Sequence, residues 1–104
     1  MSGLTTILKA INNPVRMDIL HWLKAPKQNF NLDKQLEDVD AEIEGVCVSI
    51  IQEKCGLSQS TVSSYLATLQ RANLVISKRI GPWTYYKRND ERIESFIEEL
   101  RTQL

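Results

Sequence analysis

One segment limits the possible folds of this chain more than any other: residues 56–75, GLSQSTVSSYLATLQRANLV. Apolar side chains recur in it at helical spacing, which predicts a helix with one buried face. These side chains are Val62, Leu66 and Leu69. Gly56 is a favourable end for the preceding helix, and Ser58 is a good N-cap for the one that follows. Two helices joined by a short turn that contains glycine predict a helix-turn-helix over residues 48–73.

The opposite face of this predicted helix carries small hydroxyl and amide side chains. Small residues let a helix backbone approach DNA closely, while a glutamine can bind adenine through two hydrogen bonds and a serine can bind phosphates or base edges. We expect four of them to face the major groove: Gln59, Ser60, Ser63 and Ser64. Near the helix start, Ser58 and Thr61 are expected to bind phosphates. The alternative, an ordinary surface helix, is disfavoured because serine is a mediocre helix former.

The residues after this helix predict a β-hairpin over 74–88. Asn73 stands where a left-handed residue commonly ends a helix. Residues 74–80 and 83–88 are rich in β-branched and aromatic side chains, and a Gly-Pro pair separates them. A basic hairpin after such a helix is typical of a wing, which contacts phosphates beside the groove. The expected phosphate contacts come from Lys78, Arg79 and Lys87, with Trp83 and Tyr85 packing at the base of the wing.

Charge is distributed unevenly along the chain. The 104 residues hold 13 basic and 13 acidic side chains, so the formal net charge is zero. Residues 53–88, which carry most of the predicted helix-turn-helix and the wing, hold six basic groups against one acidic group, while residues 28–52 hold six acidic groups against one lysine. Phosphates respond to charge within a Debye length of about 10 Å, so the neutral total does not argue against double-stranded DNA as the partner.

Length and composition indicate one small domain over residues 1–104. The predicted fold is mainly α-helical with a β-hairpin wing: a winged helix-turn-helix of about five helices. Further helices are expected at the N-terminus, over 15–24 after an Asn-Pro cap, and over 90–104. Residues 25–45 lack periodicity and are expected to form a long acidic loop. Without a membrane-spanning run or a signal-peptide pattern, the chain is expected in the cytoplasm, away from membranes.

Apolar stripes on the two terminal helices suit a dimer interface. A domain this small already has a core from its central helices and hairpin, so these stripes are available to a second copy. The predicted interface comprises Leu4, Ile7, Leu8, Ile93, Phe96, Ile97 and Leu100. A homodimer would place two recognition helices about 34 Å apart, one DNA turn, on a two-fold operator. The alternative is that both helices complete the core of a monomer, because that leaves the same pattern.

Three segments resemble the ArsR-type winged helix repressors. Residues 9–23, KAINNPVRMDILHWL, look like the family's ALxxPxRxxIL opening, residues 56–66 are similar to its recognition helix, and residues 81–86, GPWTYY, are similar to its wing. The resemblance implies a homodimer that represses transcription and releases DNA when it senses a metal ion, an oxidant or another signal. Ser64 and Tyr65 stand where the family often has an arginine and a histidine, so a different base preference is expected.

A metal site is not expected, and neither is a cofactor. Family members that bind metal before the recognition helix carry LCVCDL, whereas residues 46–51 here read VCVSII and keep Cys47 as the one thiol. Soft metals require two or three thiolates at one centre. The terminal helix has no histidine for the family's other metal site, and its glutamates are better explained as a solvated face. The only histidine, His21, is expected to pack in or beside the core.

Other functions stay open. Cys47 and Cys55 are possible redox residues, but eight positions on one helix place them about 12 Å apart, too far for a direct disulfide, and each could simply be a small buried apolar group. The winged helix could instead be a protein–protein interaction module, which would lack salt-dependent DNA binding. An enzyme is the weakest alternative, because the chain has neither a cofactor-cradling glycine loop nor a Ser-His-Asp or Cys-His set. The residues identify no effector, and the acidic loop could gate an effector pocket, repel DNA or be a tolerated insertion.

Overall fold

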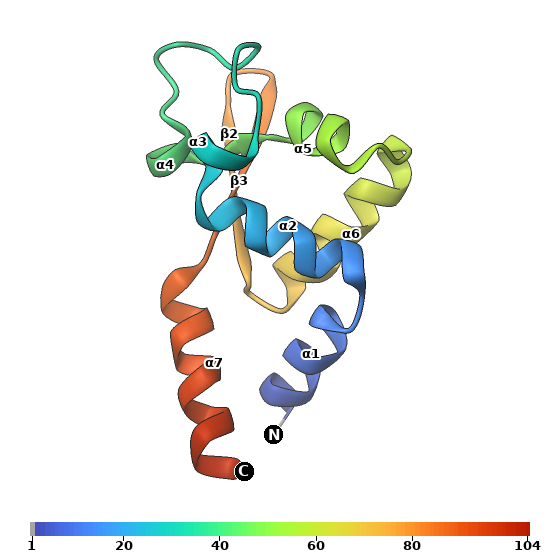
Figure 1. The fold of residues 1–104 in the computed structure, drawn as a ribbon, viewed down its shortest axis with the longest axis vertical. Coiled ribbons are helices and arrows are strands. Elements are labelled where there is room, and N and C mark those ends of the chain that lie inside the picture. Colours follow the sequence, from blue (N-terminus) through green and yellow to red (C-terminus); the bar gives the residue numbers. More distant parts are fainter. Residues whose placement is uncertain (1) are drawn as a thin grey trace.

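The computed structural model describes residues 2–104, and this part of the chain forms seven helices and three strands (Figure 1). In chain order the elements are α1 (Ser2–Ile11), α2 (Pro14–Lys24), α3 (Pro26–Asn29), α4 (Ala41–Glu44), β1 (Val46–Cys47), α5 (Val48–Cys55), α6 (Gln59–Arg71), β2 (Val75–Ile80), β3 (Trp83–Arg88) and α7 (Asp90–Gln103). The predicted winged helix-turn-helix is confirmed. Seven helices are found instead of about five because α3 and α4 are single turns of four residues.

Side-chain caps fix where the central helices begin. The Oδ1 atom of Asn13 accepts hydrogen bonds from the backbone N–H groups of Val15 and Arg16, at 2.9 and 3.0 Å. The Oγ atom of Ser58 accepts one from the backbone N–H of Thr61 at 3.2 Å. Each cap satisfies donors that the first helical turn leaves unpaired, and both caps confirm the prediction from the sequence.

Left-handed residues end both helices of the helix-turn-helix. Gly56 follows α5 with φ 68°, and Asn73 comes after α6 with φ 61°. The N–H of Asn73 donates to the carbonyl of Gln70 at 2.9 Å, and the N–H of Leu74 donates to that of Leu69 at 3.0 Å. These two bonds form a Schellman motif, which turns the chain out of α6 and into the wing.

One core joins the helices. Ile19 of α2, Ile51 of α5 and Leu66 of α6 are fully buried in it. On α6 the buried positions are the apolar stripe expected from the sequence, Val62, Leu66 and Leu69. Because the apolar stripe of α6 is buried in the core, the opposite face of α6 is exposed to solvent.

The wing belongs to a three-stranded antiparallel sheet with the order β1-β3-β2. β2 and β3 pair along their whole length, and Gly81 has φ 60° in the turn between them. On the other side of β3, β1 places Cys47 opposite Tyr85. The hairpin is therefore confirmed, whereas β1 was not anticipated because two residues are too short to show an alternating pattern.

The acidic segment, residues 25–45, is packed against the sheet instead of forming a plain loop. The buried amide of Gln35 donates to the carbonyl of Gly45 at 3.0 Å, and its Oε1 accepts from the N–H of Cys47 at 3.0 Å. The segment also contains α3 and α4. Helices of a single turn cannot show a helical period, which is why the sequence pattern indicated a loop.

The two terminal helices contact each other at the end of the molecule away from the wing tip (Figure 1). Ile7 of α1 and Phe96 of α7 are buried within the protomer, while Leu8 and Ile97 are 43% and 50% exposed. Neither these two nor any other helix within residues 2–104 has the length and apolar character needed to cross a membrane.

Candidate nucleic-acid interface

The polar face of α6 is open to solvent. Ser58 and the four side chains expected to face the groove are exposed, and Thr61 is partly buried. The Oγ of Ser58 donates to Oγ1 of Thr61 at 2.9 Å, so these two side chains already support the helix start. No hydrogen bond of the Gln59, Ser63 or Ser64 side chain is found within residues 2–104. Those three side chains are therefore free to bind an outside partner.

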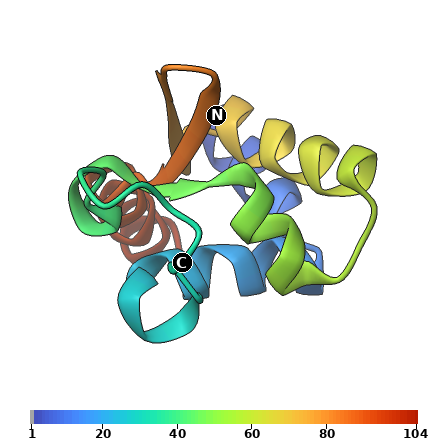
Figure 2. The same ribbon diagram turned by 90° about the horizontal axis from the view of Figure 1, so that it is seen from above.

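The wing presents its basic side chains on two opposite faces. Because side chains alternate along a strand, Arg79 shares a face with Ser77, while Lys78 and Lys87 share the other. The face of Ser77 lies toward α6, since Nε2 of Gln70 donates to Oγ of Ser77 at 2.9 Å. Figure 2 shows the hairpin standing between α4 (green) and α6 (yellow). Arg79 thus lies on the side of α6, and the two lysines lie on the side of α4.

The acidic segment binds both lysines. The Nζ of Lys78 lies 2.8 and 2.9 Å from the two carboxylate oxygens of Glu44. The Nζ of Lys87 donates to the backbone carbonyl of Ile43 at 3.1 Å. Arg79 stays exposed on the other face. Sequence reasoning missed these contacts because Glu44 and Lys78 are 34 positions apart and no local pattern relates them.

The two aromatic residues expected at the base of the wing differ in burial. Tyr85 is 1% exposed and belongs to the core, as expected. Trp83 is 47% exposed, so the expectation was wrong for this residue. Trp83 is the first residue after the turn and lies at the tip of the hairpin, away from its base.

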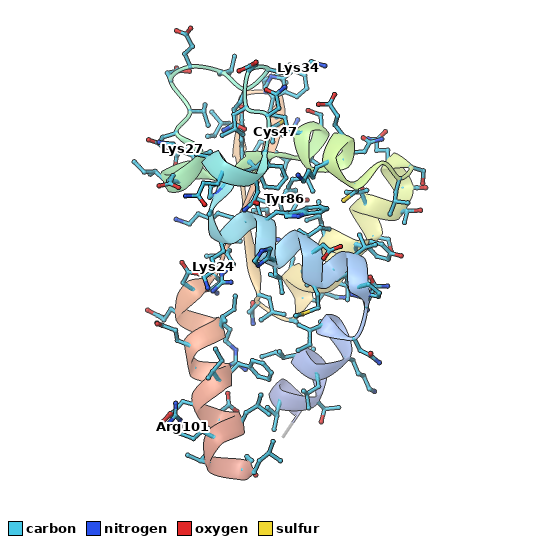
Figure 3. The ribbon with its side chains drawn as sticks, in the orientation of Figure 1. Lys24, Lys27, Lys34, Cys47, Tyr86 and Arg101 are labelled. Carbon is cyan, nitrogen blue, oxygen red and sulfur yellow. The ribbon has the colours of Figure 1, made fainter. Side chains whose placement is uncertain are left out.

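The two cysteines lie at opposite ends of α5 and are both free thiols. Cys47 is buried where the acidic segment, β1 and α5 meet (Figure 3). It lies beside a hollow of about 110 Å³, and its Sγ is 3.4 Å from Oγ of Ser49. Cys55 is half-buried, and its pKa is raised by burial and further by the nearby carboxylate of Asp18. A raised pKa keeps the thiol neutral and makes it a weaker nucleophile.

No group of three His, Cys, Asp or Glu side chains is arranged to hold a metal ion within residues 2–104. His21 is exposed, so the expectation that it packs in or beside the core was wrong. The buried residues of α2 are Ile19, Leu20 and Leu23. His21 falls outside that stripe, and the helical spacing of the three apolar residues is the signal that would have placed it on the surface.

Comparison with known proteins identifies sequence relatives, although no family model matches the chain. The chain is 43% identical over 98 residues to the uncharacterized HTH-type transcriptional regulator YbzH of Bacillus subtilis (strain 168), which covers 94% of this chain and 95% of that protein. It is 31% identical over 94 residues to the putative arsenical resistance operon repressor ArsR2 of Halobacterium salinarum, which covers 90% of this chain and 65% of that protein.

A solved structure agrees with these relatives. The homodimeric winged helix-turn-helix DNA-binding domain Mb0332 of Mycobacterium bovis, a possible ArsR-family transcriptional regulator, has a TM-score of 0.66 over 98% of this chain and 79% of that one. Its sequence identity is 21%, so this likeness concerns the fold alone. The two relatives named above are regulators of transcription, and this chain is likewise a regulator and not an enzyme. It belongs to the ArsR-type family of winged helix-turn-helix transcriptional regulators.

Proposed function

We propose that this regulator is a repressor that binds an inverted-repeat operator as a homodimer. The observation that supports the proposal best is the exposed face of α6, where Gln59, Ser63 and Ser64 have no side-chain hydrogen bond within residues 2–104. Amide and hydroxyl groups on such a helix can bind base edges once it enters the major groove. The base-reading set is Gln59, Ser60, Ser63 and Ser64, with Ser58 and Thr61 beside the phosphates.

The wing would supply contacts that do not depend on sequence. Lys78, Arg79 and Lys87 are the cations assigned to phosphates beside the groove. Arg79 is exposed on the side of α6 and has no competing carboxylate among its contacts within residues 2–104. Each phosphate contact releases condensed counterions, so this part of the binding should weaken steeply as salt rises.

The terminal helices would form the dimer. Leu8 and Ile97 are large apolar side chains that the protomer leaves about half exposed. Leu4, Ile93 and Leu100 are partly buried beside them, and Ile7 and Phe96 anchor the two helices to the core. The Mycobacterium bovis domain is homodimeric, which supports a homodimer for this chain. A dimer brings two copies of α6 to one DNA, which suits a two-fold operator.

The signal that releases DNA is proposed not to be a metal ion. One thiol at Cys47 is too few for a soft-metal centre. The second candidate function is a thiol-responsive repressor, favoured by the hollow beside Cys47, where the sulfur meets the acidic segment and the sheet. Either regulator would act in the cytoplasm, where its DNA lies.

The test is selection of bound DNA. The reduced protein is incubated with fragmented genomic DNA from its source at physiological salt, and the retained fragments are sequenced. An enriched inverted repeat with half-sites one turn apart is expected, and the Gln59→Ala, Ser63→Ala double variant should lose the enrichment while keeping its circular dichroism spectrum. Salt-insensitive retention or none would instead favour a protein–protein interaction module. A reporter placed behind the enriched repeat then shows repression.

A further inference from the structure

The contact between Glu44 and Lys78 joins the acidic segment to the DNA-binding wing. Both carboxylate oxygens of Glu44 are within 2.9 Å of the lysine Nζ. The Glu44 side chain is 28% exposed and that of Lys78 is 55% exposed. The pair is therefore reachable by water and by a DNA phosphate, but its geometry is specific.

Two sets of contacts hold the backbone next to Glu44 in place. Gly45 has φ 104°, and a Cβ atom there would lie 2.5 Å from the carbonyl oxygen of Tyr86, so the segment touches β3 directly. The buried Gln35 side chain accepts a hydrogen bond from the N–H of Cys47 and donates one to the carbonyl of Gly45. It therefore joins the acidic segment to β1 at the residues that follow Glu44. The backbone contacts place the carboxylate of Glu44 within reach of Lys78, and the pair forms at the side-chain entropy cost of any surface ion pair.

A carboxylate and a phosphate offer a lysine the same kind of partner, two charged oxygens. We infer that Glu44 competes with DNA phosphates for Lys78, so that the acidic segment sets the affinity of the wing for DNA. This inference rests on the proposed DNA-binding function. While Glu44 holds Lys78, the pair carries no net charge, and moving the lysine to a phosphate leaves an unpaired carboxylate beside DNA.

The second lysine on this face of the wing, Lys87, also binds α4. Nζ of Lys87 is bound to the carbonyl of Ile43, one residue before Glu44, so the same short helix occupies both cations on this face of the wing. Arg79 on the opposite face donates to the carbonyl of Gly81 in the turn of the wing, at 3.2 Å, and no contact between Arg79 and the acidic segment is found within residues 2–104.

The test replaces Glu44 by glutamine, which keeps the size and one hydrogen-bond acceptor but removes the charge. Glu42→Gln is the matched control, because Glu42 lies exposed on the same helix and forms no ion pair within residues 2–104. Binding to a random-sequence duplex is measured by fluorescence anisotropy from about 0.05 to 0.3 M salt. Glu44→Gln should bind about two- to fivefold tighter per subunit than the wild type. Its salt slope should steepen by about one per subunit, while that of Glu42→Gln stays near the wild-type slope.

The Lys78→Ala background separates competition from a general change in charge. In that background the gain from Glu44→Gln should vanish, whereas Arg79→Ala should weaken binding whether or not Glu44 is present. Glu44→Asp, which retains the charge, and the thermal unfolding midpoint of each variant monitor folding. If Glu44→Gln and Glu42→Gln changed the DNA affinity equally, or if Glu44→Gln still raised it in the Lys78→Ala background, this inference would be overturned while the proposed DNA-binding function would stand. Absence of any salt-dependent binding by the wild type would overturn the proposed function as well.

Discussion

The guanidinium of Arg16 lies over the ring of Tyr65, with its central carbon 5.4 Å from the ring centroid. The same guanidinium donates through Nε to the carbonyl of Ala10 at 2.6 Å and through Nη2 to that of Lys9 at 3.3 Å. Arg16 lies on α2, so it links the end of α1 to α6. This connects the helix proposed for dimerisation with the helix proposed to read DNA.

We predict that Arg16→Met lowers the free energy of unfolding by about 2–3 kcal/mol, because it removes charged hydrogen bonds to two helix-end carbonyls as well as the contact with the ring. Tyr65→Phe keeps the ring and should cost less than about 0.5 kcal/mol, whereas Tyr65→Leu should cost more. Urea unfolding followed by circular dichroism measures all three. A loss on Tyr65→Phe as large as that on Tyr65→Leu would show that the hydroxyl, and not the ring face, matters.

Gln59→Ala is expected to reduce binding to the preferred sequence by about 1–3 kcal/mol and to change binding to random DNA little. The reason is that an amide bound to a base edge carries sequence information, while phosphate contacts do not. Affinities for the selected repeat and for a scrambled duplex are compared at one salt concentration. Equal losses on both duplexes would remove the base-reading role of Gln59.

The parts of the fold that follow from short-range signals were predictable. The cap at Ser58, the left-handed residue Asn73 and the apolar stripe of α6 each depend on residues a few positions apart, and the structure has all three. Alternation along β2 also determines that Lys78 and Arg79 point to opposite faces of the hairpin.

What could not be predicted depends on partners distant in sequence or on elements too short to show a period. Lys78 meets Glu44 across 34 positions, and the buried amide of Gln35 is bound to Gly45 and Cys47. The sequence alone does not indicate that a polar residue in an acidic segment is buried, because burial depends on hydrogen-bond partners that only the fold brings near. For this reason the acidic segment was expected as a loop, and its contact with the wing was missed.

Gly45→Ala should destabilise the fold by more than about 2 kcal/mol, since it adds a Cβ atom 2.5 Å from the Tyr86 carbonyl oxygen at a backbone φ of 104°. Gly56→Ala is the matched control, because its φ of 68° is also left-handed but no atom lies within 4 Å of an added Cβ. That variant should cost only about 1 kcal/mol. Urea denaturation of both proteins gives the comparison, and similar losses would mean that the acidic segment moves away from β3 at little cost.

Alkylation of Cys55 should be slow near neutral pH. Burial and the Asp18 carboxylate raise the pKa of this thiol, so less of it is thiolate at pH 7.5 than for a free cysteine, and the rate should keep rising with pH beyond the range where a free cysteine levels off. Asp18→Asn removes the negative charge, lowers the pKa and should speed the reaction. Mass spectrometry of iodoacetamide-treated protein resolves Cys55 from Cys47. Glu37→Gln is the control for a general change in charge. If Asp18→Asn changed the alkylation rate of Cys55 no more than Glu37→Gln does, burial would be the only cause of the raised pKa.

Ile97→Glu should dissociate the proposed homodimer without unfolding the protomer. Ile97 is half exposed on α7, so a charged side chain there is tolerated by a monomer, but it would be costly when buried against a second copy. Thr102→Glu adds the same charge at an exposed polar position of the same helix and should remain dimeric. Light scattering after size-exclusion chromatography gives the mass of each variant. Because two linked recognition helices bind one repeat more tightly than one helix does, Ile97→Glu should also lose affinity for the inverted repeat far more than for a single half-site. A wild-type protein of monomer mass, or a dimer unaffected by Ile97→Glu, would assign the exposed apolar side chains of α1 and α7 a different role.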